Sequence, residues 1–308
     1  MTIRNLTIRQ LNIFDAVARN LSFSRAAEEL HLTQPAVSMQ IREMEASAGL
    51  ALFERVGKKL YVTEAGVELL RYARDILRAL SDAQEALDSL KGLGSGRINI
   101  AVVSTAKYFA SELLAQFRRR HPAIELRLLV HNREALIEQM VANQVDLAIM
   151  GTPPEAPATR AEAFAPHPSV IIAAPDHPLA GEQRVPVTAL ANDTFLVRES
   201  GSGTRSAMQQ FFAQRGATIR VGMEMASNET IKQAVMAGLG ISFLSRHTIE
   251  LELRSGRLVM LPVLGLPVVR NWHVVHLLAK RLSPSGMAFK AFVLERGRDI
   301  LRATVGGE

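Results

Sequence analysis

Apolar residues between Thr63 and Lys91 follow one another at alternating steps of four and three, which is the heptad spacing of two helices packed along a common seam. At 1.5 Å per residue, a helix of about 28 residues is about 42 Å long, which exceeds the face of one small domain. The spacing therefore predicts a long helix that pairs with the same helix of a second copy. The alternative is an amphipathic helix that packs only on its own domain. The seam residues are Leu69, Ala73, Ile76, Leu80, Ala83, Leu87 and Leu90.

Composition limits the class of protein. The chain has 308 residues, more than the roughly 100 to 200 of one domain, so two or three domains are expected. It has no cysteine, which excludes disulfides and thiolate metal sites and suits a reducing cytosol. No apolar run approaches the roughly 18 residues of a membrane span, and the N-terminus lacks the apolar core of a signal peptide. We therefore expect a soluble cytoplasmic protein without a membrane partner.

Three short helices are predicted before residue 50. Residues 7–10 form a capping box at the start of the first helix. Ser22 or Ser24 caps the second helix, and Thr33 caps the third, which has Pro35 in its first turn. The net charge of +6 lies mostly beyond residue 91, so bulk charge gives no argument that these helices bind DNA. Any such argument must come from geometry.

The third predicted helix has two different faces. Val37, Ile41 and Met44 repeat at helical spacing and are expected to point inward. The outward side presents Gln34, Pro35, Ser38, Met39 and Arg42. Two short helices joined by a tight turn, the second with small and hydrogen-bonding residues outward, predict a helix-turn-helix that inserts its second helix into the major groove of DNA.

Residues 52–63 predict a β-hairpin with Gly57, Lys58 and Lys59 at its tip. Such a hairpin can lie on DNA phosphates as a wing. A purely structural three-helix bundle would show similar helices, but the hairpin favours DNA binding.

Beyond a predicted flexible joint of Gly92, Gly94, Ser95 and Gly96, strands and helices alternate. The first part predicts strands at 97–104, 124–131 and 146–150 and helices at 106–120 and 133–143. A Pro-rich loop and a turn near Ala165 and Pro166 indicate the passage to a second part. That part predicts strands at 169–174, 194–198, 219–225, 240–244 and 258–263 and helices at 203–214, 228–237 and 246–254. A strand at 270–279 and a helix at 284–302 close the chain and can return to the first part, giving two lobes with a cleft between them.

The stretch LSFSRAAEELHLTQPAVSMQIREMEASAGLALFERVGKKLYVTEAG resembles the winged helix-turn-helix of LysR-type transcriptional regulators. The resemblance implies that Gln34, Pro35 and Ser38 sit in the major groove and that Arg55 and the wing lysines follow the backbone. It also implies that the long helix is a linker helix paired antiparallel in a dimer, with four chains favoured. The candidate DNA-binding residues are Ser24, Thr33, Gln34, Pro35, Ser38, Met39, Arg42, Arg55, Lys58 and Lys59.

Met39 departs from the family pattern, in which many members carry Arg or Lys at this position. Methionine cannot make a bidentate contact to guanine but can touch a thymine methyl group, so we expect weaker guanine readout and more reliance on Arg42 and DNA shape. The alternative is that Met39 faces water and contributes nothing.

For the C-terminal region the same resemblance implies a two-lobed α/β effector domain, similar to type 2 periplasmic solute-binding proteins with two crossing strands. The expected division is a DNA-binding domain at 1–63, a linker helix at 64–92 and an effector domain at 93–308, whose first lobe comprises 97–164 and 268–308 and whose second lobe comprises 165–267.

Ligands of open α/β sheets bind beyond the carboxyl ends of the strands. Here these ends carry hydroxyls, amides and cations at helix N-termini, where free backbone N–H groups favour an anion. The segment from Glu199 to Arg205 is the strongest candidate for an anion-binding loop, since its glycines let the backbone approach a phosphate or carboxylate. Each residue has an alternative role, such as a helix cap for Thr204 or a surface ion pair for Arg133 or Arg198. The candidate effector-binding residues are Ser104, Thr105, Lys107, Asn132, Arg133, Gly151, Arg198, Ser202, Gly203, Thr204, Arg205 and Asn228.

A narrower resemblance rests on LHLTQPAVSMQI, STAKYF, HNREAL, DLAIMGTPP, RESGSGTR and SNETIKQAVMAGLGIS, which are similar to the branch that activates bacterial carbon-fixation (Calvin-cycle, RuBisCO) operons. It implies a phosphorylated or nucleotide effector, RNA polymerase as a partner, and no cofactor. Thr152 stands where Arg is common and Ser200 where Pro is common, which leaves the ligand open. The alternative within the family is a regulator of another operon with a carboxylate or aromatic effector.

The sequence disfavours two other classes of protein. A sugar-phosphate enzyme is disfavoured because the chain has no P-loop, no His-Glu-x-x-His and no Gly-x-Ser-x-Gly motif, and no histidine pair has metal-ligand spacing on one helix. A transport binding protein is disfavoured because the chain lacks an export signal and carries the predicted DNA-binding unit. The sequence therefore predicts a regulator and not an enzyme.

Overall fold

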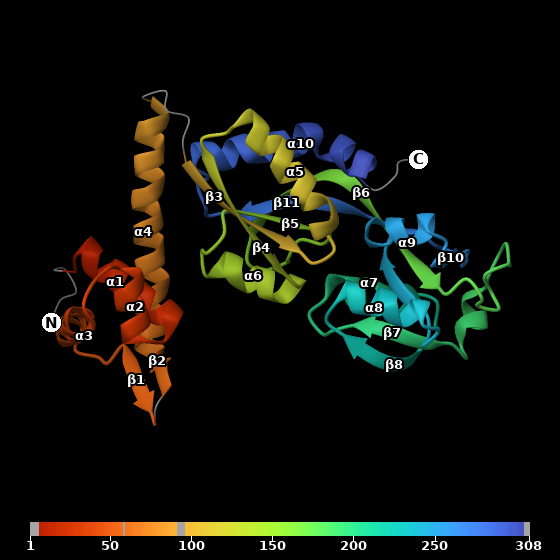
Figure 1. Ribbon diagram of the computed structural model, residues 1–308, viewed down its shortest axis with the longest axis horizontal. Coiled ribbons are helices and arrows are strands. Elements are labelled where there is room, and N and C mark those ends of the chain that lie inside the picture. The colour runs from red at the N-terminus through yellow and green to blue at the C-terminus, as the bar shows by residue number, and fades with distance from the viewer. Residues whose placement is uncertain (1–5, 58, 91–95, 305–308) are drawn as a thin grey trace. The chain divides into compact units, whose positions relative to one another are not determined.

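The computed structural model describes residues 6–57, 59–90 and 96–304. The chain divides into two compact units, residues 1–92 with 142–144 and residues 93–141 with 145–308 (Figure 1). Lys58 and the predicted joint at Gly92, Gly94 and Ser95 lie outside the described residues, whereas Gly96 belongs to a strand and not to a joint. Among the described residues, no helix combines the length and the apolar composition that crossing a bilayer requires.

The N-terminal unit is a three-helix arrangement followed by a hairpin and a long helix. Its elements are α1 (Ile8–Asn20), α2 (Phe23–Glu29), α3 (Gln34–Ala48), β1 (Phe53–Val56), β2 (Lys59–Val62) and α4 (Glu64–Leu90). The capping box at Thr7 and Gln10 is confirmed. Ser22 caps α2 through its side chain, so Ser24 is not the cap. Thr33 occupies the N-cap position of α3, but its side chain makes no capping hydrogen bond.

The core of this unit comes from the inward faces of the helices. Val37, Ile41 and Met44 of α3 are fully buried, as their spacing predicted. Phe14 of α1 packs edge-on against Phe53 of β1 at 5.4 Å between ring centroids. The hairpin is therefore part of the same core as the helices.

Helix α4 uses its apolar residues on two sides. Ala73 is 0 % exposed and, with Leu69 and Leu77, packs on the core of the N-terminal unit. Ile76 and Leu80 are 47 % and 52 % exposed. The predicted single seam is therefore divided: its first part covers the helix's own unit, and its later part presents an apolar stripe to the outside, made of Tyr72, Ile76, Leu80 and Leu87.

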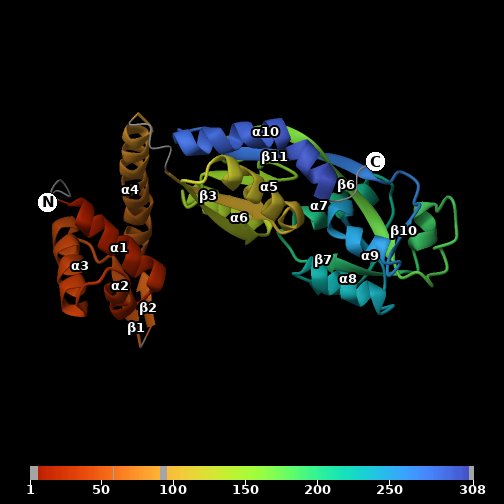
Figure 2. The ribbon, with the colours of Figure 1, turned by 45° about the horizontal axis from the view of Figure 1, so that its top comes forward.

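The C-terminal unit contains a seven-stranded mixed sheet and a separate pair of strands (Figures 1 and 2). The strands are β3 (Gly96–Val103), β4 (Ile124–His131), β5 (Leu147–Met150), β6 (Thr159–Ala173), β7 (Thr194–Arg198), β8 (Arg220–Met225), β9 (Ser242–Ser245), β10 (Val259–Leu261) and β11 (Val268–Leu277). The helices are α5 (Lys107–Arg120), α6 (Arg133–Val141), η2 (Val187–Leu190), α7 (Gly203–Ala213), α8 (Asn228–Met236), η3 (Arg246–Thr248), α9 (Glu250–Arg254) and α10 (Pro284–Thr304). A short 3₁₀ turn and α9 thus replace the single helix predicted at 246–254.

The first lobe contains three parallel strands in the order β4-β3-β5, with β11 antiparallel beside β5. The chain moves outward from β3 to β4 and then back past β3 to β5. Since such crossovers are right-handed, α5 and α6 must lie on opposite faces of the sheet, and Figure 1 shows them there, with α10 beside α5. The carboxyl ends of all three parallel strands consequently share one edge.

The second lobe packs α7 and α8 against opposite faces of β7. Alternation along β7 divides its side chains, with Phe195 and Val197 in the core on the α7 side and Leu196 in the core on the α8 side. Strand β8 pairs parallel to β7, and β9 pairs with β6.

Two long strands, β6 and β11, run antiparallel between the lobes, with Val268 opposite Ser169 and Leu277 opposite Thr159. The predicted turn near Ala165 and Pro166 is wrong, because β6 continues through it as one strand, with only a shift of register between Ala163 and Ala165. Prolines two positions apart, at 166 and 168, remove N–H groups from one edge of a strand only, so they are compatible with pairing along the other edge. Two crossing strands, as the resemblance implied, are observed.

Candidate functional site

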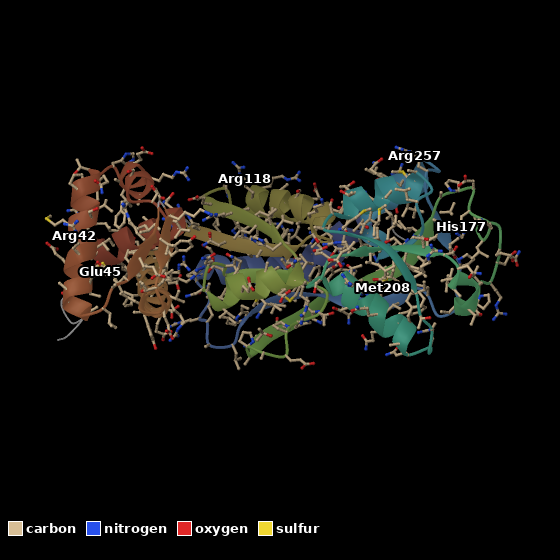
Figure 3. All side chains as sticks on the ribbon, turned by 90° about the horizontal axis from the view of Figure 1, so that it is seen from below. Arg42, Glu45, Arg118, His177, Met208 and Arg257 are labelled. Carbon is tan, nitrogen blue, oxygen red and sulfur yellow. The ribbon has the colours of Figure 1, made fainter. Side chains whose placement is uncertain are left out.

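The outward face of α3 is open. Met39 is 54 % exposed, and Pro35 and Arg42 are exposed beside it. The amide of Gln34 donates a hydrogen bond to the hydroxyl of Ser38 at 2.8 Å, so two polar groups near the helix start are held together. Figure 3 shows Arg42 and Glu45 on this helix. The face carries donors, acceptors and one apolar tip, which are the groups that read base edges.

The hairpin is fixed to α3 by one carboxylate. Glu45 accepts hydrogen bonds from the backbone N–H groups of Leu52 and Phe53, at 2.9 and 3.2 Å. At the same open end of the hairpin, the Thr63 hydroxyl donates to the Ala51 carbonyl at 2.7 Å. These bonds set the position of β1 and β2 relative to the outward face of α3.

Exposed cations follow the hairpin. Arg55 on β1 and Lys59 on β2 are exposed on either side of the tip, and Lys58 lies outside the described residues. Thr33 and Ser24 are also exposed. The α3 face and the hairpin therefore present exposed polar and cationic side chains from one compact unit.

A second candidate site is a narrow pocket between the lobes of the C-terminal unit, with a cavity volume of about 20 Å³. Eight of the predicted effector-binding residues line it: Ser104, Thr105, Asn132, Arg133, Gly151, Ser202, Gly203 and Thr204. The rest of the lining is Val103, Met150, Thr152, His167 and Arg270.

Loops at helix starts supply most of the polar wall. Asn132 caps α6 by accepting from the N–H of Ala135 at 2.9 Å, and Ser202 caps α7 by accepting from the N–H of Thr204 at 3.3 Å. The guanidinium of Arg133 is held across the mouth by two carbonyls, of Thr152 at 3.0 Å and Pro153 at 3.2 Å. The first turn of α7 adds free backbone N–H groups that attract an anion.

Arg270 on β11 forms part of the pocket floor and was not foreseen from the sequence. It donates to the Gly203 carbonyl at 3.2 Å and to the hydroxyls of Thr152 and Ser169 at 3.3 and 3.4 Å. Burial lowers the pKa of Arg270 to about 10, so it is still charged at neutral pH. In the part of the chain that the structure describes, neither Arg270 nor Arg133 forms an ion pair with a carboxylate. Two unneutralised guanidinium groups therefore face one small pocket.

His167 on β6 lies beside Arg270 and was also missed. It is 2 % exposed and stacks on Trp272 with 3.8 Å between ring centroids and 17° between planes. Trp272 in turn donates its indole N–H to Nδ1 of His247 at 3.0 Å. Burial holds the pKa of His167 well below its ordinary value, and the charge of Arg270 lowers it further. Burial also lowers the pKa of His247 to about 4.

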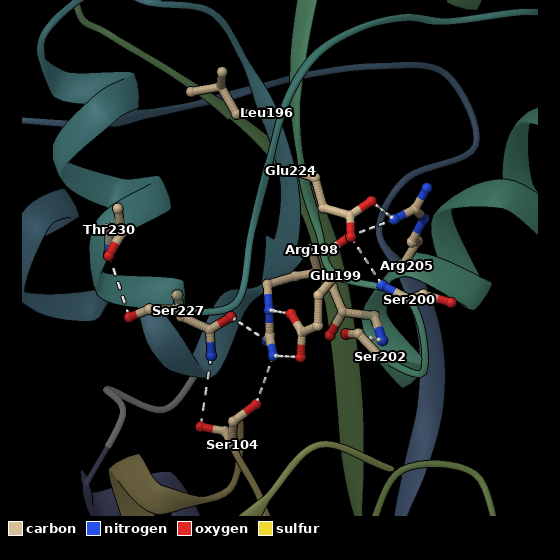
Figure 4. Close-up of polar contacts among 12 residues, drawn as sticks. Ser104, Leu196, Arg198, Glu199, Ser200, Ser202, Arg205, Glu224, Ser227 and Thr230 are labelled. Carbon is tan, nitrogen blue, oxygen red and sulfur yellow. Dashed lines mark hydrogen bonds and ion pairs between the residues drawn. The ribbon is translucent and has the colours of Figure 1, made fainter. Parts of the chain in front are cut away.

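Four predicted effector-binding residues do not line the pocket. Arg198 is buried, with 3 % of its surface exposed. Its guanidinium donates two hydrogen bonds to the carboxylate of Glu199, at 2.7 and 2.8 Å, and one to the side-chain oxygen of Asn228, at 2.6 Å (Figure 4). Arg198 also donates to the Ser104 hydroxyl of the other lobe at 3.0 Å. Arg205 pairs with Glu224 instead. Lys107 lies over the ring of Tyr108, 5.2 Å from its centroid.

Arg198 and Asn228 thus join the lobes beside the pocket. A second connection lies at Tyr108 of α5, whose hydroxyl donates to Glu229 of α8. Lys232 of α8 is buried between Glu229, at 3.1 Å, and Glu252, at 2.9 Å. Burial and Glu229 raise the pKa of Tyr108, so it stays a neutral donor. In the described residues, no three His, Asp or Glu side chains gather as metal ligands would.

The buried histidines predict a loss of stability in weak acid. Their folded-state pKa values lie below the unfolded value of 6.5, so the unfolded chain binds more protons as the pH falls. The stability contributed by the neutral rings is complete above pH 6.5 and is lost as the pH falls through the folded-state pKa values. For His247 alone we expect the free energy of unfolding to fall by about 2 kcal/mol between pH 7.5 and 5, measured by urea unfolding, and His167 adds to this loss. A His247→Asn variant keeps an acceptor for Trp272 and should show a flatter pH profile; an unchanged profile would contradict the assignment.

Comparison with known proteins gives two family matches. Residues 8–67 match the model of the bacterial regulatory helix-turn-helix proteins of the lysR family, and residues 91–298 match the LysR substrate binding domain. A RuBisCO operon transcriptional regulator of Allochromatium vinosum is 54 % identical over 290 residues, which cover 94 % of this chain and 96 % of that protein. The HTH-type transcriptional regulator CbbR of Rhodospirillum rubrum is 52 % identical over 291 residues, covering 94 % and 97 %.

Two solved structures are also similar. The regulatory domain of Synechocystis PCC6803 CcmR in complex with 2-PG is 41 % identical, with a TM-score of 0.63, and covers 65 % of this chain and 97 % of that one. Full-length CbnR complexed with its target DNA is 20 % identical, with a TM-score of 0.68, and covers 94 % and 99 %. The second likeness concerns the fold alone.

Proposed function

The chain belongs to the LysR family of bacterial transcriptional regulators, and from this premise we propose that it regulates a RuBisCO operon by binding promoter DNA through α3 and the hairpin and a small anionic metabolite through the pocket. The observation that carries the proposal is identity of 54 % and 52 % over nearly the whole length of carbon-fixation regulators. The protein acts as a regulator and not as an enzyme. Because its target is promoter DNA, its place is the cytoplasm.

In this proposal α3 lies in the major groove. Gln34, Pro35, Ser38, Met39 and Arg42 face base edges, and their exposure and the Gln34–Ser38 hydrogen bond support this role. Arg55, Lys58 and Lys59 follow the phosphates, with Ser24 and Thr33 at the edge of the interface. Residues 1–63 form the DNA-binding domain, residues 64–92 the linker helix and residues 93–308 the effector domain in this proposal.

The protein pairs with itself through α4. Support comes from the exposed stripe of Tyr72, Ile76, Leu80 and Leu87, an apolar surface that a lone chain would leave in water. Two such pairs make the tetramer expected for the family, and RNA polymerase is the partner at the promoter. A purified protein that sediments as a monomer would contradict this part.

The effector is a small phosphorylated acid of the type of 2-PG, the compound in complex with the CcmR domain. The pocket supports an anion through Arg133, Arg270 and the start of α7. Its walls come from both lobes, which are connected by β6 and β11. A bound anion therefore favours one closure of the lobes over another and alters how the paired units hold the promoter.

The test is a gel-shift and footprint assay on the promoter of the RuBisCO operon of the same organism. We expect retardation that is specific for this DNA and weakens steeply with salt, as phosphate contacts require. We also expect 2-PG to change the footprint length or the DNA bend. Equal affinity for unrelated DNA would refute the promoter assignment, and an unchanged complex with 2-PG would refute the effector assignment.

A Met39→Arg variant is expected to change the preferred base in each half-site, because arginine can form two hydrogen bonds to guanine where methionine cannot. The expected gain for guanine at that position is about 1 to 3 kcal/mol, measured by selection from randomised half-sites. Met287→Arg is the matched control, since Met287 of α10 is 55 % exposed and Met39 is 54 % exposed. Identical specificity in both variants would place Met39 outside the base-reading surface.

A further inference from the structure

His167 is enclosed without a hydrogen-bond partner although it borders the pocket. In the described structure, neither of its two ring nitrogens has a partner. Gly151 makes room for the ring, since a Cβ at this position would lie 2.6 Å from Nδ1 of His167. A buried polar group without a partner costs free energy that an apolar residue would not. A ligand that accepts a hydrogen bond from His167 would remove this cost.

Arg270 is the direct cross-strand neighbour of His167. The two residues oppose each other in the register of β6 and β11, so both side chains project to the same face. The Nε of Arg270 also has no partner among the described residues. Burial disfavours a proton on His167, and the positive charge of Arg270 beside it lowers the pKa of the imidazole further.

The groups that act on His167 come from two other elements. Arg270 and Trp272 face it from β11, and His247 faces it from η3, with its own charge suppressed by burial and by Arg246. No carboxylate is among the charged groups that act on it. The missing negative charge must come from a ligand if His167 is to hold a proton.

Trp272 favours the charged form of His167 once an anion is present. The stacked geometry places the imidazole over the indole face, where a cation is attracted by the ring. The hydrogen bond from Trp272 to His247 prevents the indole from turning away. A phosphate group on the pocket side and the indole on the other side would then both stabilise an imidazolium.

We propose that the pocket binds a phosphate monoester dianion together with one proton, which His167 takes up from solvent, so that the regulator responds jointly to metabolite and hydrogen ion. The proposal deepens, and rests on, the proposed binding of an anionic effector. No covalent bond changes: the proton moves from water or buffer to a ring nitrogen of His167, and that N–H donates to a phosphate oxygen. Arg270 and Arg133 supply the remaining positive charge. His167 and Arg270 lie on the two strands that connect the lobes, so the proton and the ligand would act on this connection.

The test uses the full-length protein with 2-PG as the probe. Calorimetry in two buffers of different ionisation enthalpy at pH 7.5 is expected to show uptake of close to one proton per bound ligand. The dissociation constant should rise with pH, up to about tenfold per unit between pH 7 and 8, where the second phosphate ionisation, near pH 6, no longer interferes. Trp272 is the chain's single tryptophan, and an imidazolium quenches an indole on which it stacks, so its fluorescence should fall when 2-PG binds.

Variants separate His167 from other histidines. His167→Gln is expected to bind 2-PG more weakly, without proton uptake and with an affinity independent of pH between 7 and 8. The control is His121→Gln, which changes a histidine at the end of α5 beside Phe117 and should behave as wild type.

Failure of this proposal and failure of the proposed function are distinguishable. Wild-type binding of 2-PG without buffer-dependent heat, and with the same affinity at pH 7 and 8, overturns the proton linkage and leaves the effector assignment standing. This measurement needs no variant, so a folding defect in His167→Gln cannot obscure it. Absence of binding of both 2-PG and inorganic phosphate overturns the anionic effector and the linkage together, while promoter binding is judged separately by the gel shift.

Discussion

An Arg270→Met variant is expected to bind 2-PG about a hundredfold more weakly while keeping its specific affinity for promoter DNA. Removing one partner of a partly buried charge contact costs about 3 kcal/mol, which corresponds to about a factor of one hundred in the dissociation constant. Methionine keeps much of the length of the side chain but can neither donate hydrogen bonds nor offset the ligand's charge. Isothermal calorimetry with 2-PG measures the effect directly.

Arg215→Met is a suitable control for this substitution. Arg215 lies in the second lobe outside the pocket lining, with its guanidinium 3.9 Å from the centroid of Phe211 and a hydrogen bond to the Phe211 carbonyl at 3.0 Å. The Arg215→Met substitution, like Arg270→Met, removes one positive charge from a partly buried site. If Arg270→Met and Arg215→Met bind 2-PG with affinities within a factor of three of each other, Arg270 does not hold the anion.

A Gly66→Ala variant is expected to destabilise the N-terminal unit by about 3 kcal/mol and so to lose most DNA binding. Gly66 lies in the first turn of α4, where a Cβ would be 2.2 Å from the Leu52 carbonyl oxygen and 2.7 Å from a methyl carbon of Val62. Leu52 cannot retreat easily because its own N–H is bound to Glu45. Circular dichroism during urea unfolding and a gel shift at the same temperature measure the two effects.

Gly57→Ala tests whether steric overlap is the cause. Gly57 has a φ of +63°, which disfavours alanine, but no other atom lies within 4 Å of a Cβ built there. It should cost about 1 kcal/mol and leave DNA binding largely intact. If Gly66→Ala and Gly57→Ala lose the same stability and the same DNA binding, steric overlap between residue 66 and Leu52 is not the cause.

The parts of the fold that the sequence predicted well depend on signals within a few residues. The capping box at Thr7, the inward spacing of α3 and the hairpin after Leu52 are each encoded by neighbouring residues, and the structure has them at or near the predicted bounds. The parallel strands of the first lobe were also predictable, because short apolar runs alternate with amphipathic segments. Their shared edge explains why residues after β3, β4 and β5 were correctly expected to come together in one pocket.

The floor of the pocket was not predictable in this way. His167 and Arg270 are about a hundred residues apart in sequence and meet only because β6 pairs with β11. The two prolines in β6 indicate a turn by local rules, and only the long partner strand shows that they are compatible with a strand. Similarly, the neighbouring Glu199 gives Arg198 a local ion-pair partner, but the sequence around it does not show that Asn228 and Ser104 also accept its hydrogen bonds.

The two-sided use of α4 limits how movement can pass through the protein. Ala73 is sealed inside the N-terminal unit, while Tyr72 beside it and Ile76 one turn later are about half exposed. Sliding or twisting the helix against its own unit would open that interior and expose apolar atoms to water. In the proposed pair of α4 helices, a change in the angle at which they meet would therefore rotate each N-terminal unit as a whole, and a small change of angle at the stripe would displace α3 along the promoter.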